Sequence, residues 1–130
     1  MVSVAGVIIK NKEGEYLLQL RGKDAPTAKN QWGLFGGHME GNESPIEAAR
    51  RELKEELNLD FTQDRFIFLE MMTLEDADEG MVHQHLFSLL LELEEKIKLG
   101  EGEGYGCFTK KAIELLNLPQ PMSDIAAKYF

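Results

Sequence analysis

Residues 44–57 are the part of this sequence that most constrains how the chain can fold. They open with Ser44-Pro45-Ile46-Glu47, a capping box with a proline in the first helical position, which is typical of a helix N-terminus. Asn58 follows the segment, and Asn tolerates the left-handed conformation in which many helices end. The apolar side chains between these ends recur at helical spacing, at Ile46, Ala49, Leu53 and Leu57. We therefore predict a helix that packs one apolar stripe against a core.

The rest of the chain has the pattern of short strands with a few helices between them. We predict strands over residues 2–10, 16–21, 32–35, 65–74 and 82–93, with Asn11-Lys12-Glu13-Gly14 as the turn of an opening hairpin. In the last of these strands, the alternate residues from His83 to Leu93 are expected to face the core. Short helices are expected after Thr109 and Ser123, because each can act as a cap. This order predicts one layered α/β or α+β domain over residues 1–130.

The net charge of −9 limits the functions that such a domain can have. An acidic surface repels nucleic acid, so binding to a duplex is not expected. It also repels free nucleotides, so a phosphate substrate would need a basic patch or a bound divalent cation. The chain has no secretory signal, no apolar run near the ~18 residues that cross a bilayer, and one cysteine, Cys107, which we expect to be buried and inert. These features predict a cytoplasmic protein with no membrane contact.

Three carboxylates lie on one side of the predicted helix. Glu52, Glu55 and Glu56 fall within an arc of roughly 100° beside the apolar stripe. Like charges three or four residues apart each cost about 0.2–0.5 kcal/mol in an isolated helix, and they raise one another's pKa. A hard divalent cation such as Mg²⁺ relieves both effects, because it prefers oxygen ligands. The same glutamates could instead form a solvated face with ion pairs such as Arg51–Glu55, since Glu is a strong helix former.

The helix is the end of a longer pattern of fixed residues. Gly37 is followed by five residues, Glu43, seven residues and then Arg51-Glu52-Leu53-Lys54-Glu55-Glu56-Leu57-Asn58-Leu59. This pattern resembles the Nudix box, Gly-x5-Glu-x7-Arg-Glu-U-x-Glu-Glu-x-Gly-U, where U is a bulky aliphatic residue and Asn58 replaces the final Gly. Six identities and two aliphatic residues arise by chance on the order of once in ten million placements. The preceding Trp32-Gly33-Leu34-Phe35-Gly36-Gly37 is similar to the lead-in of that family, with Phe35 in place of Pro.

The resemblance implies an α/β fold, specifically a Nudix-type α/β/α sandwich around a mixed β-sheet. It also implies that Glu52, Glu55 and Glu56 bind Mg²⁺, or Mn²⁺ in its place, and that the backbone carbonyl of Gly36 or Gly37 adds another hard oxygen.

Two further residues of the box have implied supporting roles. Arg51 would orient Glu52 or a neighbouring carboxylate rather than contact substrate. Glu43 would tie the loop to the helix, although the helix dipole alone also favours a carboxylate at this position.

The implied activity is hydrolysis of a phosphoanhydride bond in a nucleoside diphosphate linked to another moiety. A nucleoside triphosphate, cleaved to monophosphate and pyrophosphate, is the leading substrate; an ADP-ribose-like NDP-sugar and a dinucleoside polyphosphate are alternatives. A module that senses nucleotides without turnover belongs to another class, and the complete set of glutamates argues against it. The general base for the attacking water could be a box glutamate, Glu101 or Glu103. A homodimer is compatible with each alternative.

Outside the box the residues have weaker signals. Arg21 and Lys23 could hold a distal phosphate, or they could form an exposed surface pair. His83 and His85 share a strand face and could bind a metal, although partly buried residues at the edge of a core are the more common case. Trp32 could stack on a base, or it could belong to the core.

Overall fold

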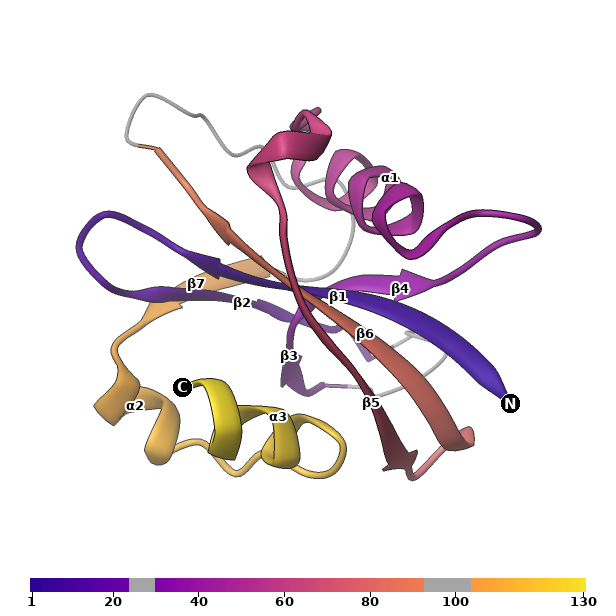
Figure 1. Cartoon of the computed structure of the whole chain (residues 1–130). Coiled ribbons are helices and arrows are strands. Elements are labelled where there is room, and N and C mark those ends of the chain that lie inside the picture. The colour runs from indigo at the N-terminus through magenta and orange to yellow at the C-terminus, as the bar shows by residue number, and fades with distance from the viewer. Residues whose placement is uncertain (24–29, 93–103) are drawn as a thin grey trace.

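The computed structural model describes residues 1–23, 30–92 and 104–130. Strands and helices follow one another in much the order that the sequence predicts (Figure 1). The strands are β1 (Val2–Lys10), β2 (Tyr16–Leu20), β3 (Trp32–Gly33), β4 (Phe35–His38), β5 (Ile67–Asp76), β6 (Gly80–Leu90) and β7 (Gly104–Phe108). The helices are α1 (Pro45–Leu57), a single 3-10 turn η1 (Gln63–Arg65), α2 (Lys110–Glu114) and α3 (Met122–Tyr129).

Strand β1 organises the sheet, because it pairs along both of its edges. On one edge it runs parallel to β6 from Val2 to Lys10, and β6 in turn pairs antiparallel with β5. On the other edge its first half pairs antiparallel with β4, while Ile9 and Lys10 pair with β2. Strand β2 also pairs with β3 and β7. The sheet is therefore mixed, as predicted, and the glycines of β4 lie beside its central strand.

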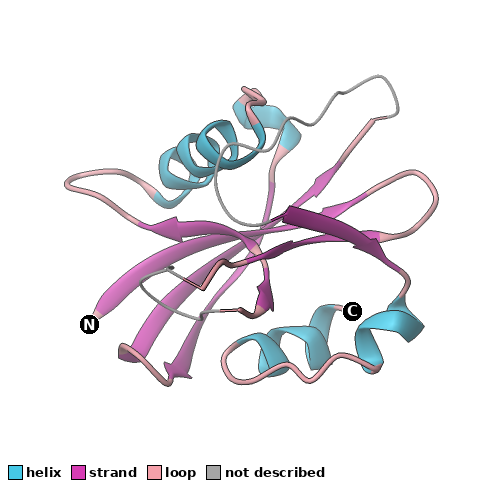
Figure 2. Cartoon of the chain, turned by 180° about the vertical axis from the view of Figure 1, so that it is seen from behind, coloured by secondary structure: helices cyan, strands magenta, loops and turns pink. Residues whose placement is uncertain are grey.

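Helices cover both faces of this sheet. Figures 1 and 2 show α1 on one face and α2 with α3 on the other. The core under α1 includes Leu53, Leu57 and Phe87, whereas Ile125 of α3 packs on a second core with Val82 and Leu86. The arrangement confirms the predicted α/β/α sandwich. None of the helices in the three described ranges has the length and apolar character needed to cross a bilayer.

Helix α1 begins and ends as the sequence predicts. The Ser44 hydroxyl accepts a hydrogen bond from the Glu47 amide, and the Glu47 carboxylate accepts one from the Ser44 amide. At the other end, Asn58 is left-handed, with φ 56° and ψ 33°, and its amide donates to the Lys54 carbonyl at 3.0 Å. These caps satisfy backbone groups that a helix end leaves without partners.

The prediction for the buried face of β6 is only partly correct. Phe87, Leu89 and Leu91 are buried, but His83 and His85 are only half-buried. On the opposite face Val82 and Leu86 are buried too. The reason is that β6 lies inside the sheet between β1 and β5, with a helical layer on each side, so both of its faces contribute to a core. Residue 93, the last of the predicted strand, lies outside the described residues.

Two other local predictions need correction. The expected strand over residues 32–35 is two strands separated by Leu34, and the second continues through Gly36-Gly37 to His38. Ser123 does not cap α3; it lies inside that helix, whose N-cap is Pro121, and its amide donates to the Pro119 carbonyl. Thr109 does cap α2, since its hydroxyl accepts from the Ala112 amide.

The left-handed end of α1 leads to a test of the one departure from the box. We expect Asn58→Gly to leave the free energy of unfolding nearly unchanged, because Gly adopts positive φ without cost. Asn58→Val should lower it by roughly 1–2 kcal/mol, since a β-branched residue resists that conformation. Urea unfolding of the two variants measures the difference, and equal stabilities would contradict the account of this helix end.

Candidate active site

The two consecutive glycines of β4 lie where no other residue fits without displacing a neighbour. Gly36 has φ +140°, and a Cβ there would lie 2.0 Å from the Ala5 carbonyl oxygen of β1. A Cβ on Gly37 would lie 2.6 Å from a carboxylate oxygen of Glu52. Glycine therefore allows β4 to approach the central strand on one side and a glutamate of α1 on the other.

Glu56 is the buried carboxyl group of the site, with only 4% of its surface exposed. One of its oxygens accepts a hydrogen bond from the Gly36 amide at 2.8 Å, and the other accepts from Nε2 of Gln19 at 2.9 Å. Burial raises the pKa of Glu56 to about 8, although both hydrogen bonds favour the charged form and oppose the shift. The negative charge of Glu52 also contributes to the raised pKa of Glu56.

Arg51 connects the carboxylates around the glycine strand. Its Nε and Nη2 donate to the two oxygens of Glu43 at 2.6 and 3.0 Å, and Nη1 donates to Glu52 at 2.9 Å. Nη2 also donates to the His38 carbonyl at the end of β4. The bond to Arg51 lowers the pKa of Glu43, whose carboxylate also accepts from the Glu40 amide at 2.8 Å. Glu43 thus joins the loop before α1 to the helix.

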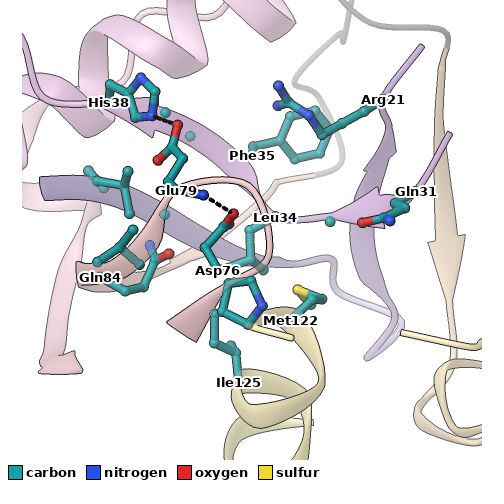
Figure 3. Close-up of a pocket in the computed structure, with 18 of the residues that line it drawn as sticks. Arg21, Gln31, Leu34, Phe35, His38, Asp76, Glu79, Gln84, Met122 and Ile125 are labelled. Atoms are coloured by element: carbon teal, nitrogen blue, oxygen red, sulfur yellow. Dashed lines mark hydrogen bonds and ion pairs between the residues drawn. The ribbon is translucent and has the colours of Figure 1, made fainter. Parts of the chain in front are cut away.

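A pocket of about 400 Å³ opens beside these groups. It extends from Glu52, Glu56 and the β4 glycines to α3, where Met122 and Ile125 form its far wall (Figure 3). The remaining lining residues come from β1, the ends of β2 and β6, the segment from β3 to the loop after β4, the β5–β6 turn and residues 119–121 before α3.

The turn between β5 and β6 closes one side of the pocket. The Glu79 carboxylate lies 2.6 Å from Nε2 of His38, and the Glu79 amide donates to the Asp76 carboxylate at 3.1 Å (Figure 3). Asp76 and Glu79 therefore add negative charge at this side of the pocket.

The structure brings together some of the predicted site residues and separates others. Glu52, Glu56, Gly37 and Arg21 line the pocket. Glu55 does not line it; its side chain is 44% exposed and lies 3.4 Å from Arg51.

The sequence also proposed Lys23, Glu101 and Glu103 as site residues. Lys23 is exposed and does not line it, so the structure gives Arg21 and Lys23 no shared site. Glu101 and Glu103, the candidate bases outside the box, lie outside the described residues.

Gln19 is a site residue that the sequence pattern alone did not indicate. Its side chain is almost fully buried, and its Nε2 donates both to Glu56 and to the Leu34 carbonyl. The available signal was a single amide in the otherwise apolar strand Tyr16–Leu20. A polar side chain buried at such a position needs a partner, and here the partner is the carboxyl group of the predicted helix.

The other candidate residues have ordinary environments. Trp32 is half-buried, lines the pocket and packs edge-on against Phe108, with 4.9 Å between ring centroids. Cys107 is exposed, which corrects the expectation of a buried thiol, because residues alternate in exposure along β7 and Cys107 lies on its exposed side. Partial burial nevertheless raises the pKa of Cys107, which lowers its reactivity. Partial burial also lowers the pKa of His85.

The oxygen atoms at the α1 end of the pocket are of the kind that a hard divalent cation binds, but their side chains do not yet converge on one point. Glu52, Glu56 and the backbone oxygens of Gly36-Gly37 are the oxygen donors that Mg²⁺ prefers. The high pKa of Glu56 also indicates a carboxyl group that a nearby positive charge would ionise. Within the described ranges, however, no three His, Cys, Asp or Glu side chains converge to hold an ion.

The buried Glu56 predicts how stability depends on pH. Because its pKa is higher in the folded protein than in the unfolded chain, the folded state binds the extra proton between about pH 4.5 and 8. In that interval the free energy of unfolding should fall as pH rises, by an amount on the order of a few kcal/mol. Urea unfolding between pH 5 and 8.5, in EDTA, measures this slope.

Glu56→Gln is the matched control for that slope, because the amide has the shape of the protonated acid and does not titrate. The variant should lose less stability than the wild type over the same interval. Identical slopes in the two proteins would show that Glu56 is ionised throughout.

Comparisons with known proteins agree with this geometry. A family model of the NUDIX domain matches residues 1–129. No curated protein matches the chain significantly in sequence. A MutT protein from Methanosarcina mazei Go1 superposes with a TM-score of 0.80 at 23% identity, covering 98% of this chain and 91% of that one. A MutT NUDIX hydrolase from Burkholderia pseudomallei gives 0.80 at 22% identity, with coverages of 99% and 98%.

A third similar structure was solved with a ligand. The NUDIX domain of NrtR from Shewanella oneidensis, complexed with ADP ribose, gives a TM-score of 0.80 at 14% identity and covers 98% of this chain and 85% of that one. At such identities these structures show the shared fold, while the family model rests on the sequence itself. With the glycine strand, Arg51 and the glutamates of α1 at the positions that the box requires, the chain belongs to the Nudix hydrolase family.

Proposed function

We propose that residues 1–130 act as one Nudix hydrolase domain that uses Mg²⁺ to cleave a phosphoanhydride bond in a nucleoside diphosphate linked to another moiety. The leading substrate is a nucleoside triphosphate, cleaved to a monophosphate and pyrophosphate. Mn²⁺ can substitute for Mg²⁺ in this proposal, because both are cations that carboxylate oxygens bind. We place the activity in the cytoplasm, because a chain with a single cysteine cannot form an internal disulfide and fits a reducing compartment.

The buried carboxyl group of Glu56 is the observation that carries this proposal. A domain selected only for stability would not keep a carboxyl group 4% exposed with a pKa of about 8. Glu56 lies at the wall of the pocket, shares that wall with Glu52, and is bonded to the glycine strand through the Gly36 amide. Perturbed carboxyl groups that converge on a pocket are the usual mark of a catalytic centre.

Divalent metal ions are generally used by Nudix hydrolases. We propose that Glu52, Glu56 and the carbonyl of Gly37 would hold the cation, with Glu55 joining them after release from Arg51. A bound cation supplies charge neutralisation for the diphosphate and Lewis-acid polarisation of its oxygens. The substrate of an acidic protein would therefore meet positive charge at this wall of the pocket and at Arg21.

The chain's own residues supply orientation and proton transfer. Arg51 holds Glu52 from one side, and Glu43 holds Arg51 in turn, so the carboxylate keeps its direction toward the pocket. Arg21 is placed to bind a phosphate at the pocket wall. A carboxylate accepts the proton of the attacking water, and the candidates are the box glutamates Glu52, Glu55 and Glu56, together with Glu101 and Glu103.

Hydrolysis of an ADP-ribose-like compound is the second candidate activity. It is supported by the NrtR domain, which has the same fold and was solved with ADP ribose. Both activities use the same carboxylates and differ only in the group beyond the diphosphate. A screen of nucleoside triphosphates, NDP-sugars and dinucleoside polyphosphates with Mg²⁺ separates them by the product released.

Substitution of the pocket glutamates tests the proposed chemistry. Glu52→Gln and Glu56→Gln should each lower kcat by about 10²-fold or more on the best substrate of the screen, because each removes charge that acts on the transition state. Glu114→Gln, on the exposed side of α2, is the control and should retain full activity. Normal kcat in both pocket variants, with circular dichroism showing a folded protein, would contradict the assignment.

A further inference from the structure

Gln84 is a buried amide that the proposed chemistry does not use. It lies on β6 between Val82 and Leu86, on the face that packs toward α3, and only 8% of it is exposed. Its side-chain amide makes no hydrogen bond to any residue in the described ranges, yet its polar atoms are not sealed off, because they face the pocket (Figure 3). A side chain that is more than nine-tenths buried and turns an unpaired amide into a pocket is available to a partner from outside the chain.

The neighbouring strand is adapted to this side chain. A Cβ on Gly6 would lie 2.7 Å from Nε2 of Gln84 and 3.1 Å from a methyl carbon of Leu34. Glycine at this position of β1 therefore leaves the space that the amide occupies. The backbone at Gly6 does not require glycine, since its φ is not positive, and glycine in the middle of a strand weakens packing. Room for the Gln84 amide therefore explains why glycine is found there.

The surroundings of the amide indicate the shape of its partner. Leu34, Met122 and Ile125 supply apolar walls, and Gln84 is the buried polar group among them. α3, which carries two of these walls, is fixed to the sheet because Tyr129 and Lys128 both bind the Glu70 carboxylate of β5. A slot with apolar walls and one buried amide, open on the side of the Asp76 and Glu79 carboxylates, suits a flat ring that presents a hydrogen-bond donor beside an acceptor.

We propose that this slot binds the base of the nucleotide and that Gln84 is the residue that reads its hydrogen-bonding edge. A glutamine amide offers a donor and an acceptor side by side, the pattern with which it pairs to base edges elsewhere. The inference rests on the proposed function for the diphosphate, which would lie at the opposite end of the same pocket beside Glu52 and Glu56. It makes Gln84, outside the Nudix box, a specificity-determining residue.

Binding of ligands that cannot be hydrolysed tests this assignment separately from catalysis. We expect at least one of AMP, GMP, CMP and UMP to bind the wild-type chain 10-fold or more tightly than ribose 5-phosphate, measured by NMR titration with Mg²⁺. Gln84→Met, which keeps the volume and removes both hydrogen-bonding groups, should lower that ratio several-fold and level the differences among the four nucleotides, while the apolar walls keep part of the preference. Gly6→Ala, which displaces the amide without altering it, should also reduce the ratio.

Gln120→Ala is the control for these variants, since Gln120 also lines the pocket but is exposed and bonded to Asp124. It should keep the wild-type ratio. Thermal melting identifies any variant that fails to fold, and Gln84→Glu then replaces Gln84→Met; having lost the donor, it should rank the four nucleotides in a different order.

The outcomes separate this inference from the proposed function. A wild-type chain that binds ribose 5-phosphate as tightly as every nucleotide would overturn the base slot, even if it hydrolyses nucleoside triphosphates. The base slot would also be overturned if Gln84→Met and Gly6→Ala both kept the wild-type ratio. A chain that prefers a nucleotide through Gln84 but hydrolyses none of the substrates would keep the slot and refute the hydrolase.

Discussion

The hydrogen bonds of Glu56 are the interaction on which the site depends. Through one oxygen it fixes the Gly36 amide of β4, and through the other it fixes Gln19 of β2, so one carboxyl group of α1 is bonded to two strands on the same edge of β1. The glycine strand then lies where the Glu52 carboxylate can approach it. Burial disfavours the charged form of Glu56 and so raises its pKa. A nearby cation would therefore favour the loss of its proton.

The hydrogen bonds of Glu56 to β4 and β2 also determine where negative charge lies in the pocket. Glu52 and Glu56 lie at the α1 end, and Asp76 and Glu79 add carboxylates at the β5–β6 turn. Arg51 is occupied by Glu43 and Glu52, so its charge holds the site together instead of facing the pocket. Under the proposed function, an anionic substrate would therefore arrive with a cation, which would allow a chain with net charge −9 to act on phosphates.

The sequence predicts the parts of this structure that local rules determine. The capping box, the left-handed Asn58, the first hairpin and the mixed sandwich follow from turn chemistry, periodicity and the box. The prediction for β6 was wrong in part because periodicity cannot tell that a strand is covered on both faces. Gln19 could not be paired with Glu56 from sequence, since 37 residues separate the two and only the sheet brings them together.

The partners of these glutamates were the other element that the sequence could not supply. A helical projection puts Glu56 nearest the apolar stripe and Glu55 farthest from it, in agreement with the buried Glu56 and the exposed Glu55. That Glu52 faces Gly37 and that Glu56 bonds to the Gly36 amide follows only from the packing of β4 against α1. The sequence likewise could not predict a role for Gln84, because only the structure shows that Gly6 and Leu34 leave space for its amide.

The proposed mechanism requires that Glu56 holds a proton in the metal-free protein and gives it up when a divalent cation binds. Calorimetric titration of the wild-type chain with Mg²⁺ near pH 7, in two buffers with different ionisation enthalpies, counts the protons released on binding. We expect release approaching one proton per chain, and close to none for Glu56→Gln. Binding of Mg²⁺ with no proton release by the wild-type chain would contradict this mechanism.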